Sequence, residues 1–152
     1  MEKIYKVSKL LTPNDVGPPF SSTHQDRVHV SKESQDLLGF FPSLNPEEIN
    51  PEEPLEIFDV QDSESWHFRF VYFNGKQHGT SSRDEYAITS GPRHFGTNYS
   101  MREYLKKKTA RPNDIVVLQK DDDIYYIEWN GNADTPNVNE SITTHGNGRW
   151  KI

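Results

Sequence analysis

The stretch that decides the fold reads His67-Phe68-Arg69-Phe70-Val71-Tyr72-Phe73-Asn74. Successive side chains of an extended strand point to opposite faces, so Phe68, Phe70 and Tyr72 share one face of this segment. The other face also carries apolar residues, Val71 and Phe73. The pattern therefore predicts a strand with apolar surface on both sides, in the centre of a sheet.

Alternating or β-branched segments on either side of this strand predict six more strands. They cover residues 3–11, 27–30, 55–60, 85–89, 115–118 and 124–129, and the last two form a hairpin around Asp121-Asp122-Asp123. Two short helices are expected, Lys32 to Leu38 ended by Gly39, and Met101 to Lys107 begun by a Ser100 to Glu103 capping box. Seven strands and two helices, without parallel βαβ alternation, predict a mainly β, barrel-like domain.

The 152 residues fit one folded domain, which we expect over 1–129, and 130–152 read as a polar C-terminal extension or linker. The chain has no Cys, which excludes disulfides and zinc fingers. No segment has the roughly 20 apolar residues of a membrane span, and the start lacks a signal peptide. We expect a soluble, cytoplasmic protein that needs no cofactor.

The net charge of -6 argues against a nucleic-acid partner only if its distribution is ignored. Residues 33–65 hold ten acids and no Lys or Arg, whereas residues 66–111 hold nine Lys or Arg and three acids. The middle of the chain is therefore a basic segment that suits a polyanion.

Two long polar loops, Asn14 to Gln25 and Gly75 to Ser82, are candidate binding arms, because long ordered loops in compact domains are often functional. The second loop and the strand entering from it, Lys76 to Tyr86, contain Arg, Gln, Asp and Glu, whose side chains match the hydrogen-bonding edges of guanine, adenine and cytosine. Many polar hairpins have such a composition, so the residues alone leave open a non-catalytic β-domain that binds a protein or a modified base.

Signatures of catalysis are missing from the sequence. No phosphate-binding G-x-x-x-x-G-K-[ST], zinc-binding H-E-x-x-H or G-x-S-x-G nucleophile elbow occurs. Asp121 to Asp123 with a loop His would suit a metal-dependent hydrolase, but adjacent acids in a hairpin turn are more often a solvated loop. We therefore expect no catalytic centre and no metal site in this chain.

The motifs Leu10-Leu11-Thr12-Pro13-Asn14-Asp15-Val16-Gly17, His24-Gln25 and Arg83-Asp84-Glu85-Tyr86-Ala87-Ile88-Thr89 resemble the amino-terminal effector domain of EcoRII-type restriction endonucleases. That domain shares a DNA-binding pseudobarrel with the B-three domain of plant transcription factors. The resemblance covers about Val7 to Thr89, and Arg111 to Leu118 is similar to the end of plant B-three domains. It implies that two arms grip the major groove of double-stranded DNA.

Carried onto this sequence, the first arm is Asn14 to Gln25 and the second is Lys76 to Tyr86. Positions held by Lys and Arg in the EcoRII domain are Ser81, Tyr86 and Ala87 here, so the recognised sequence is expected to differ. Arg83 and Glu85 suit a short G·C-rich site. The nuclease domain implied by the family would belong to another part of the protein or to another chain. The expected DNA-contacting residues are Asn14, Ser22, His24, Gln25, Lys76, Gln77, His78, Ser81, Ser82, Arg83, Asp84, Glu85, Tyr86 and Arg93.

Overall fold

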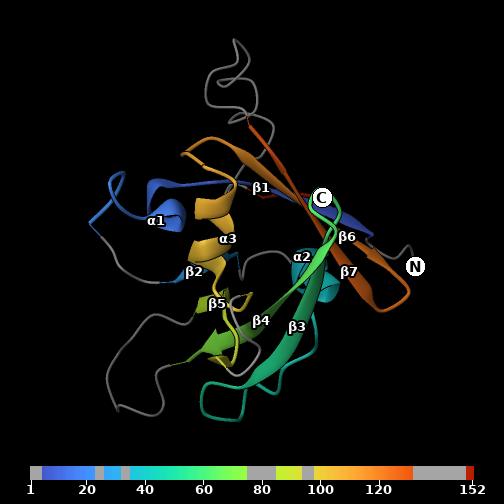
Figure 1. The fold of residues 1–152 in the computed structure, drawn as a ribbon. Helices are drawn as coiled ribbons and strands as arrows, with labels where there is room; N and C mark the ends of the chain where they lie inside the picture. Colours follow the sequence, from blue (N-terminus) through green and yellow to red (C-terminus); the bar gives the residue numbers. More distant parts are fainter. Residues whose placement is uncertain (1–4, 23–25, 32–34, 75–84, 94–97, 132–149) are drawn as a thin grey trace.

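A computed structural model of the chain describes residues 5–22, 26–31, 35–74, 85–93, 98–131 and 150–152. Within them, eight strands form one sheet in the order β2-β5-β4-β3-β7-β6-β1-β8, curled into a barrel-like shape (Figure 1). The elements are β1 (Lys6–Leu10), α1 (Pro13–Val16), β2 (Arg27–Val30), α2 (Gln35–Phe40), β3 (Glu52–Asp59), β4 (Glu64–Phe73), β5 (Glu85–Ser90), α3 (Met101–Lys107), β6 (Ile115–Asp121), β7 (Ile124–Asn130) and β8 (Trp150–Lys151).

The strand predicted to be central is central. β4 pairs antiparallel with β3 on one side and with β5 on the other. Phe68 and Phe70 are each 1% exposed, and Val71, on the opposite face, is 2% exposed. Burial on both faces explains why this strand has the most apolar sequence in the chain.

One pairing gives the sheet its barrel form. β3 and β7 run parallel, with Ile57 opposite Tyr125, while the other strand pairs of the described sheet are antiparallel. This contact joins β2-β5-β4-β3 to β7-β6-β1-β8. The two halves then face each other across a common apolar core.

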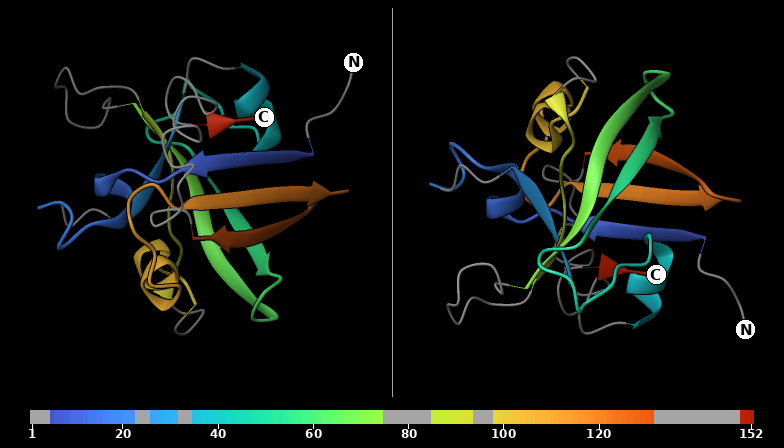
Figure 2. Two further views of the ribbon diagram at one scale, coloured as in Figure 1. Left: turned by 90° about the horizontal axis from the view of Figure 1, so that it is seen from above. Right: turned by 90° about the horizontal axis from the view of Figure 1, so that it is seen from below.

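The helices α2 and α3 lie on opposite sides of the barrel (Figure 2). On one side Tyr104 of α3 meets the ring of Trp66 edge to face at 5.4 Å. On the other, Phe41, just after α2, stacks on Phe70 at 4.7 Å. The Tyr125 hydroxyl donates to the carbonyl of Phe40 at 2.8 Å, and burial raises the pKa of this phenol to about 12, so it remains a donor at neutral pH.

Strand β2, which follows the first arm, is joined to β1 and β8 by side chains. These side chains converge on the peptide groups of His29. Lys9 Nζ and the Trp150 indole N–H both donate to the His29 carbonyl, at 3.2 and 3.0 Å. The His29 N–H donates to Asp15 Oδ1 at 3.4 Å, and Asp15 Oδ2 lies 3.6 Å from Lys9 Nζ. Lys9 and Asp15 are 2% and 4% exposed, so this is a buried, paired and hydrogen-bonded seam.

Three features differ from the sequence-based expectation. A third helix, α1, lies at the start of the first arm, where we expected only loop. α2 continues through Gly39 to Phe40 because Leu37 and Phe40 are both buried in the core, and packing outweighs the weak helix propensity of glycine. Trp150 and Lys151, placed by sequence in the polar extension, pair with β1 as an eighth strand.

Replacing Trp150 with Ala should destabilise the fold by about 3–5 kcal/mol, because the change empties a core site and leaves the His29 carbonyl with one donor fewer. Urea unfolding followed by tryptophan fluorescence or circular dichroism measures the free energy of unfolding. Ile152→Ala is the matched control, since Ile152 is 53% exposed and should change stability by less than about 0.5 kcal/mol. Equal, small effects of both changes would show that β8 does not belong to the folded domain.

Candidate nucleic-acid interface

The first predicted arm begins with a rigid, capped turn. The Thr12 hydroxyl accepts from the Asp15 N–H at 3.1 Å, and Asp15 Oδ2 accepts from the Thr12 N–H at 2.9 Å, which caps α1 reciprocally. Gly17 follows at φ 85°, and a Cβ there would lie 2.7 Å from the guanidinium of Arg102. The positive φ favours glycine at this position, whereas the Arg102 side chain could move aside for a Cβ.

Beyond Gly17 the chain folds back on itself. The Phe20 N–H donates to the Gly17 carbonyl at 2.9 Å, and the Ser21 hydroxyl donates to Asn14 Oδ1 at 2.5 Å. Of the residues predicted to contact DNA in this arm, Asn14 and Ser22 are exposed, whereas His24 and Gln25 lie outside the described residues. The described part of the arm therefore has a defined shape with polar groups on its surface.

Asp26 fixes the other end of the first arm. Its Oδ1 accepts from the Arg102 N–H at 2.7 Å, and its Oδ2 accepts from the hydroxyls of Ser100 and Ser90. Its carbonyl accepts from the Thr89 hydroxyl at 2.6 Å. A carboxylate at the N-terminus of α3 also interacts favourably with the unpaired N–H groups there.

The second predicted arm leaves the sheet between β4 and β5, whose last pair is Phe73 and Glu85. Asn74 and Asn50 exchange two backbone-to-side-chain hydrogen bonds of 3.1 and 3.2 Å, which holds the end of β4. On the β5 side, Tyr86 stacks on Tyr72 at 4.4 Å and packs against the core. Both ends of the arm are thus anchored, and the ends of β4 and β5 that flank it lie on the same side of the barrel as the described part of the first arm (Figures 1 and 2).

Most of the residues predicted in the second arm are not among the described residues. Outside the described residues lie Lys76, Gln77, His78, Ser81, Ser82, Arg83 and Asp84. Glu85 and Tyr86 are half-buried, and Arg93 is exposed just beyond the far end of β5 from Glu85. The structure therefore brings Glu85 and Tyr86 to the foot of this arm and sets Arg93 apart from them.

Sequence reasoning missed two residues on the strand that follows the first arm. Arg27 and His29 share the face of β2 opposite to the buried Val28 and Val30. Arg27 Nη1 donates to Glu85 Oε1 at 3.0 Å, so Glu85 has an ion-pair partner that the chain order did not suggest. The alternation of Arg27-Val28-His29-Val30 was the available signal, but the pairing of β2 with β5 could not be read from it.

His29 is exposed at this face, and partial burial, together with the nearby Lys9 charge, lowers the pKa of its imidazole. The imidazole is therefore largely neutral at pH 7. A neutral imidazole offers one donor and one acceptor, which suits hydrogen bonding more than phosphate neutralisation.

Two of the three lysines at the end of α3 are engaged within the protein. Lys108 Nζ lies 2.8 Å from Asp59 Oδ2 and 2.6 Å from Asp62 Oδ2, and Lys107 pairs with Glu64. Burial opposes the charge of Lys108, but the hydrogen bonds and charges of Asp59 and Asp62 outweigh it and raise the pKa of the ammonium. Lys106 and Lys107 are both exposed, but Lys107 is held by Glu64.

The same carboxylates form the one three-residue cluster of possible metal ligands in the described part of the chain. Asp59, Asp62 and Glu64 offer oxygens within 4.8 Å of one another. Their charges are already balanced by Lys107 and Lys108, so the cluster belongs to the anchoring of α3. The acids Asp121 to Asp123 instead lie exposed in the β6–β7 turn, as a solvated hairpin loop would.

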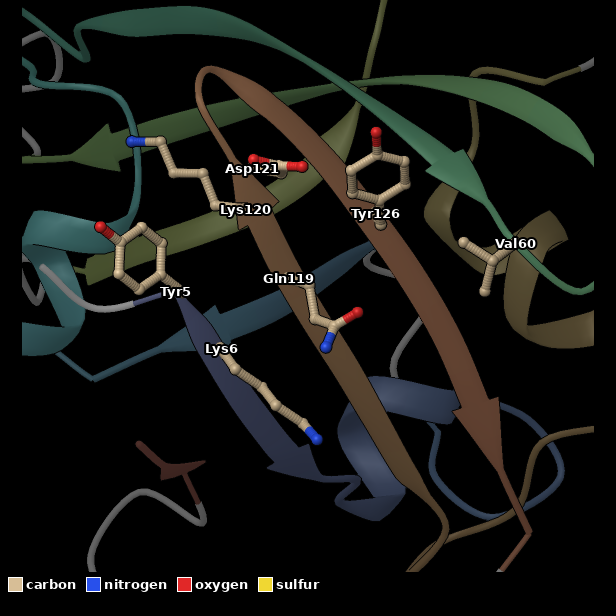
Figure 3. A pocket seen from close by; sticks show the side chains of 7 residues that line it. All are labelled: Tyr5, Lys6, Val60, Gln119, Lys120, Asp121 and Tyr126. Atoms are coloured by element: carbon tan, nitrogen blue, oxygen red, sulfur yellow. The ribbon is translucent and has the colours of Figure 1, made fainter.

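A shallow pocket of about 410 Å³ lies at the other end of the barrel from the arms (Figures 2 and 3). The ends of β1, β6 and β7 form it, with the turn after β3 at its edge. Its lining residues are Tyr5, Lys6, Val60, Gln119, Lys120, Asp121 and Tyr126. Asn14, Ser22, Glu85, Tyr86 and Arg93, the described residues among those predicted to contact DNA, do not line this pocket.

No protein-family model matches the chain. Over 133 residues it is 27% identical to the B3 domain-containing transcription factor NGA2 of Arabidopsis thaliana, a match that covers 85% of this chain and 36% of that protein. The chain thus spans about a third of the length of this relative.

Two solved structures have a similar fold. The Arabidopsis FUS3–DNA complex matches with a TM-score of 0.57 and 15% identity, over 83% of this chain and 96% of that chain. The complex of the Arabidopsis thaliana transcription factor LEC2 with DNA matches with a TM-score of 0.53 and 19% identity, over 85% and 97%. The chain has a B3-like pseudobarrel fold, which confirms the predicted fold class, with eight described strands in place of seven.

Every helix in the described part of the chain is too short and too polar to cross a membrane.

Replacing Lys108 with Ala should cost about 3–5 kcal/mol of stability at pH 7, because it leaves the fully buried Asp59 without its cation. Lys106→Ala, on the same helix turn, is the control and should be nearly neutral. Urea unfolding at several pH values provides the measurement.

The effect of Lys108→Ala should also depend on pH. In the wild type, the hydrogen bond that Asp62 accepts from Lys108 lowers the pKa of the Asp62 carboxyl from the ordinary 3.8. This carboxylate therefore stabilises the wild type above pH 3.8, and the stabilisation is lost as the pH falls through the lowered pKa. The stability difference between wild type and variant should therefore narrow in acid. A difference that is small at pH 7, or that widens in acid, would contradict the assignment of these lysines to the fold.

Proposed function

We propose that this chain is a sequence-specific double-stranded DNA-binding module that inserts two arms into the major groove. The observation that supports the proposal is structural: the described part of the first arm and the strand ends that flank the second lie on one side of a pseudobarrel whose fold is similar to that in the two DNA complexes. The major groove is about 12 Å wide and displays a distinct pattern of donors and acceptors for every base pair. Two short arms can read that pattern without a recognition helix.

The charges of the chain support the same partner. The basic residues of 66–111 outnumber the acids by six, and the second arm falls within this segment. Four charged residues of this segment have partners inside the fold: Arg69, Lys107 and Lys108 pair with carboxylates, and Glu85 pairs with Arg27. The proposed phosphate ligands are Lys76 of the second arm and Arg93, which lies just beyond β5, and these contacts set the salt dependence of binding.

We assign base contacts to Asn14, Ser22, His24 and Gln25 of the first arm and to residues of the second arm. In the second arm Arg83 is proposed to donate to guanine and Glu85 to accept from cytosine, so the site should be short and rich in G·C pairs. Glu85 can keep Arg27 while doing so, because a carboxylate has about four acceptor positions. The remaining proposed members are Gln77, His78, Ser81, Ser82, Asp84 and Tyr86.

The module has no catalytic role of its own in this proposal and works as part of a larger protein. Its arms resemble those of EcoRII-type effector domains, which supports a role in restriction, with the nuclease domain in another region or another chain. The NGA2 match, in which the chain covers 36% of that protein, equally supports a module within a longer chain. Cleavage of bound DNA by this chain alone in Mg²⁺ would contradict the non-catalytic assignment.

Selection of bound duplexes from a random library, followed by fluorescence anisotropy with the selected and a scrambled duplex, tests the proposal. The selected duplex should bind at least about 10³-fold more tightly than the scrambled one, as specific DNA-binding domains do. The logarithm of both association constants should fall linearly with the logarithm of salt concentration, because each phosphate contact releases counterions. Binding that is indifferent to salt, or equal on both duplexes, would favour a β-domain that binds a protein or another ligand.

A further inference from the structure

One side chain connects the two arms. Arg27 is the second residue after Gln25, where the first arm ends, and its backbone pairs with Thr89. Its guanidinium reaches along the sheet to Glu85 Oε1, at 3.0 Å, and its central carbon lies 4.3 Å from the centre of the Phe73 ring. Phe73 and Glu85 are the last paired residues of β4 and β5 before the second arm.

Two contacts hold the guanidinium. One Nη1–H donates to Glu85 Oε1, and the central carbon lies over the ring of Phe73. The Arg27 and Glu85 side chains are each 26% exposed, so the pair is partly shielded from solvent.

Arg27 lies two residues after the end of the first arm at Gln25 and begins β2, whose backbone pairs with β5. Asp26, directly before it, is bonded to α3 and to β5 by its carboxylate, which fixes the chain where the first arm ends. The guanidinium is bound to Glu85 and Phe73, where the second arm leaves the sheet. Arg27 thus adds a side-chain link between the feet of the two arms to the backbone pairing of β2 with β5.

We propose that Arg27 is a positioning residue that sets the separation of the two arms and couples their contacts with DNA. The inference rests on the proposed function. Specific binding needs both arms in register with base edges of one groove, whereas non-specific binding needs only phosphate contacts. Loss of Arg27 should thus lower the affinity for the selected duplex far more than the affinity for a scrambled one.

The experiment compares Arg27→Ala with Arg69→Ala on the selected and the scrambled duplex at one salt concentration. Arg69 also pairs with a glutamate within the sheet, Glu52, so both variants lose one positive charge and one Arg–Glu pair. Arg27→Ala should weaken binding of the selected duplex about 10-fold or more, a loss in the range of a single mismatched base pair, and that of the scrambled duplex by less than about 3-fold. Arg69→Ala should change both by the same small factor.

Measuring the coupling between the arms distinguishes a positioning role of Arg27 from a role in stability alone. Ser22→Ala, Arg83→Ala and the double variant are made both in the wild type and in Arg27→Ala. Their dissociation constants for the selected duplex give one double-mutant cycle in each background. The effects of the two arm variants should be non-additive when Arg27 is present and should become additive when it is absent. Phe73→Leu, which keeps an apolar side chain but removes the ring face, serves as a second test variant and should also weaken the coupling.

The outcomes are distinct. If the wild-type chain fails to prefer any duplex, the proposed function fails. If the wild type is selective, but Arg27→Ala behaves like Arg69→Ala or leaves the coupling between arms unchanged, the function stands and the positioning role of Arg27 is wrong. Thermal unfolding of each variant, with binding measured well below its melting temperature, ensures that only folded protein is compared.

Discussion

The buried seam at His29 is the constraint on which the rest of this structure depends. β2 lies at one edge of the sheet, far along the strand order from β1 and β8, and the seam joins these edges through side chains instead of a strand ladder. Lys9 and Trp150 satisfy the His29 carbonyl, and Asp15 satisfies its N–H. Because Asp15 lies in α1 and His29 in β2, the seam also holds together the two ends of the first arm.

The internal ion pairs determine which charges remain for a partner. Lys107 and Lys108 balance a group of carboxylates at the turn after β3, and Lys9 is committed to Asp15. Arg27 and Glu85 neutralise each other between the arms. Part of the acidic charge is thus compensated inside the fold, which reduces its repulsion of the proposed polyanionic partner.

Much of the fold could be predicted because it follows from local pattern. The alternation around Phe68 and Phe70 indicated β4, the capping box at Ser100 indicated α3, and Ile115 to Trp129 indicated the β6–β7 hairpin. The long-range pairings could not be predicted. The eighth strand at Trp150 and the extension of α2 through Gly39 depend on core contacts between residues far apart in the sequence. The same limit applies to the candidate site: composition and resemblance indicated the arms, but not the Arg27–Glu85 pair, since 58 residues separate its members.

The central claim is that the two arms read one major groove, and methylation interference on the selected duplex tests it most directly. Methylation of guanine N7 in the major groove should abolish binding at positions within the site, while methylation of adenine N3 in the minor groove should be tolerated. Interference at adenine N3 without interference at guanine N7 would contradict the account.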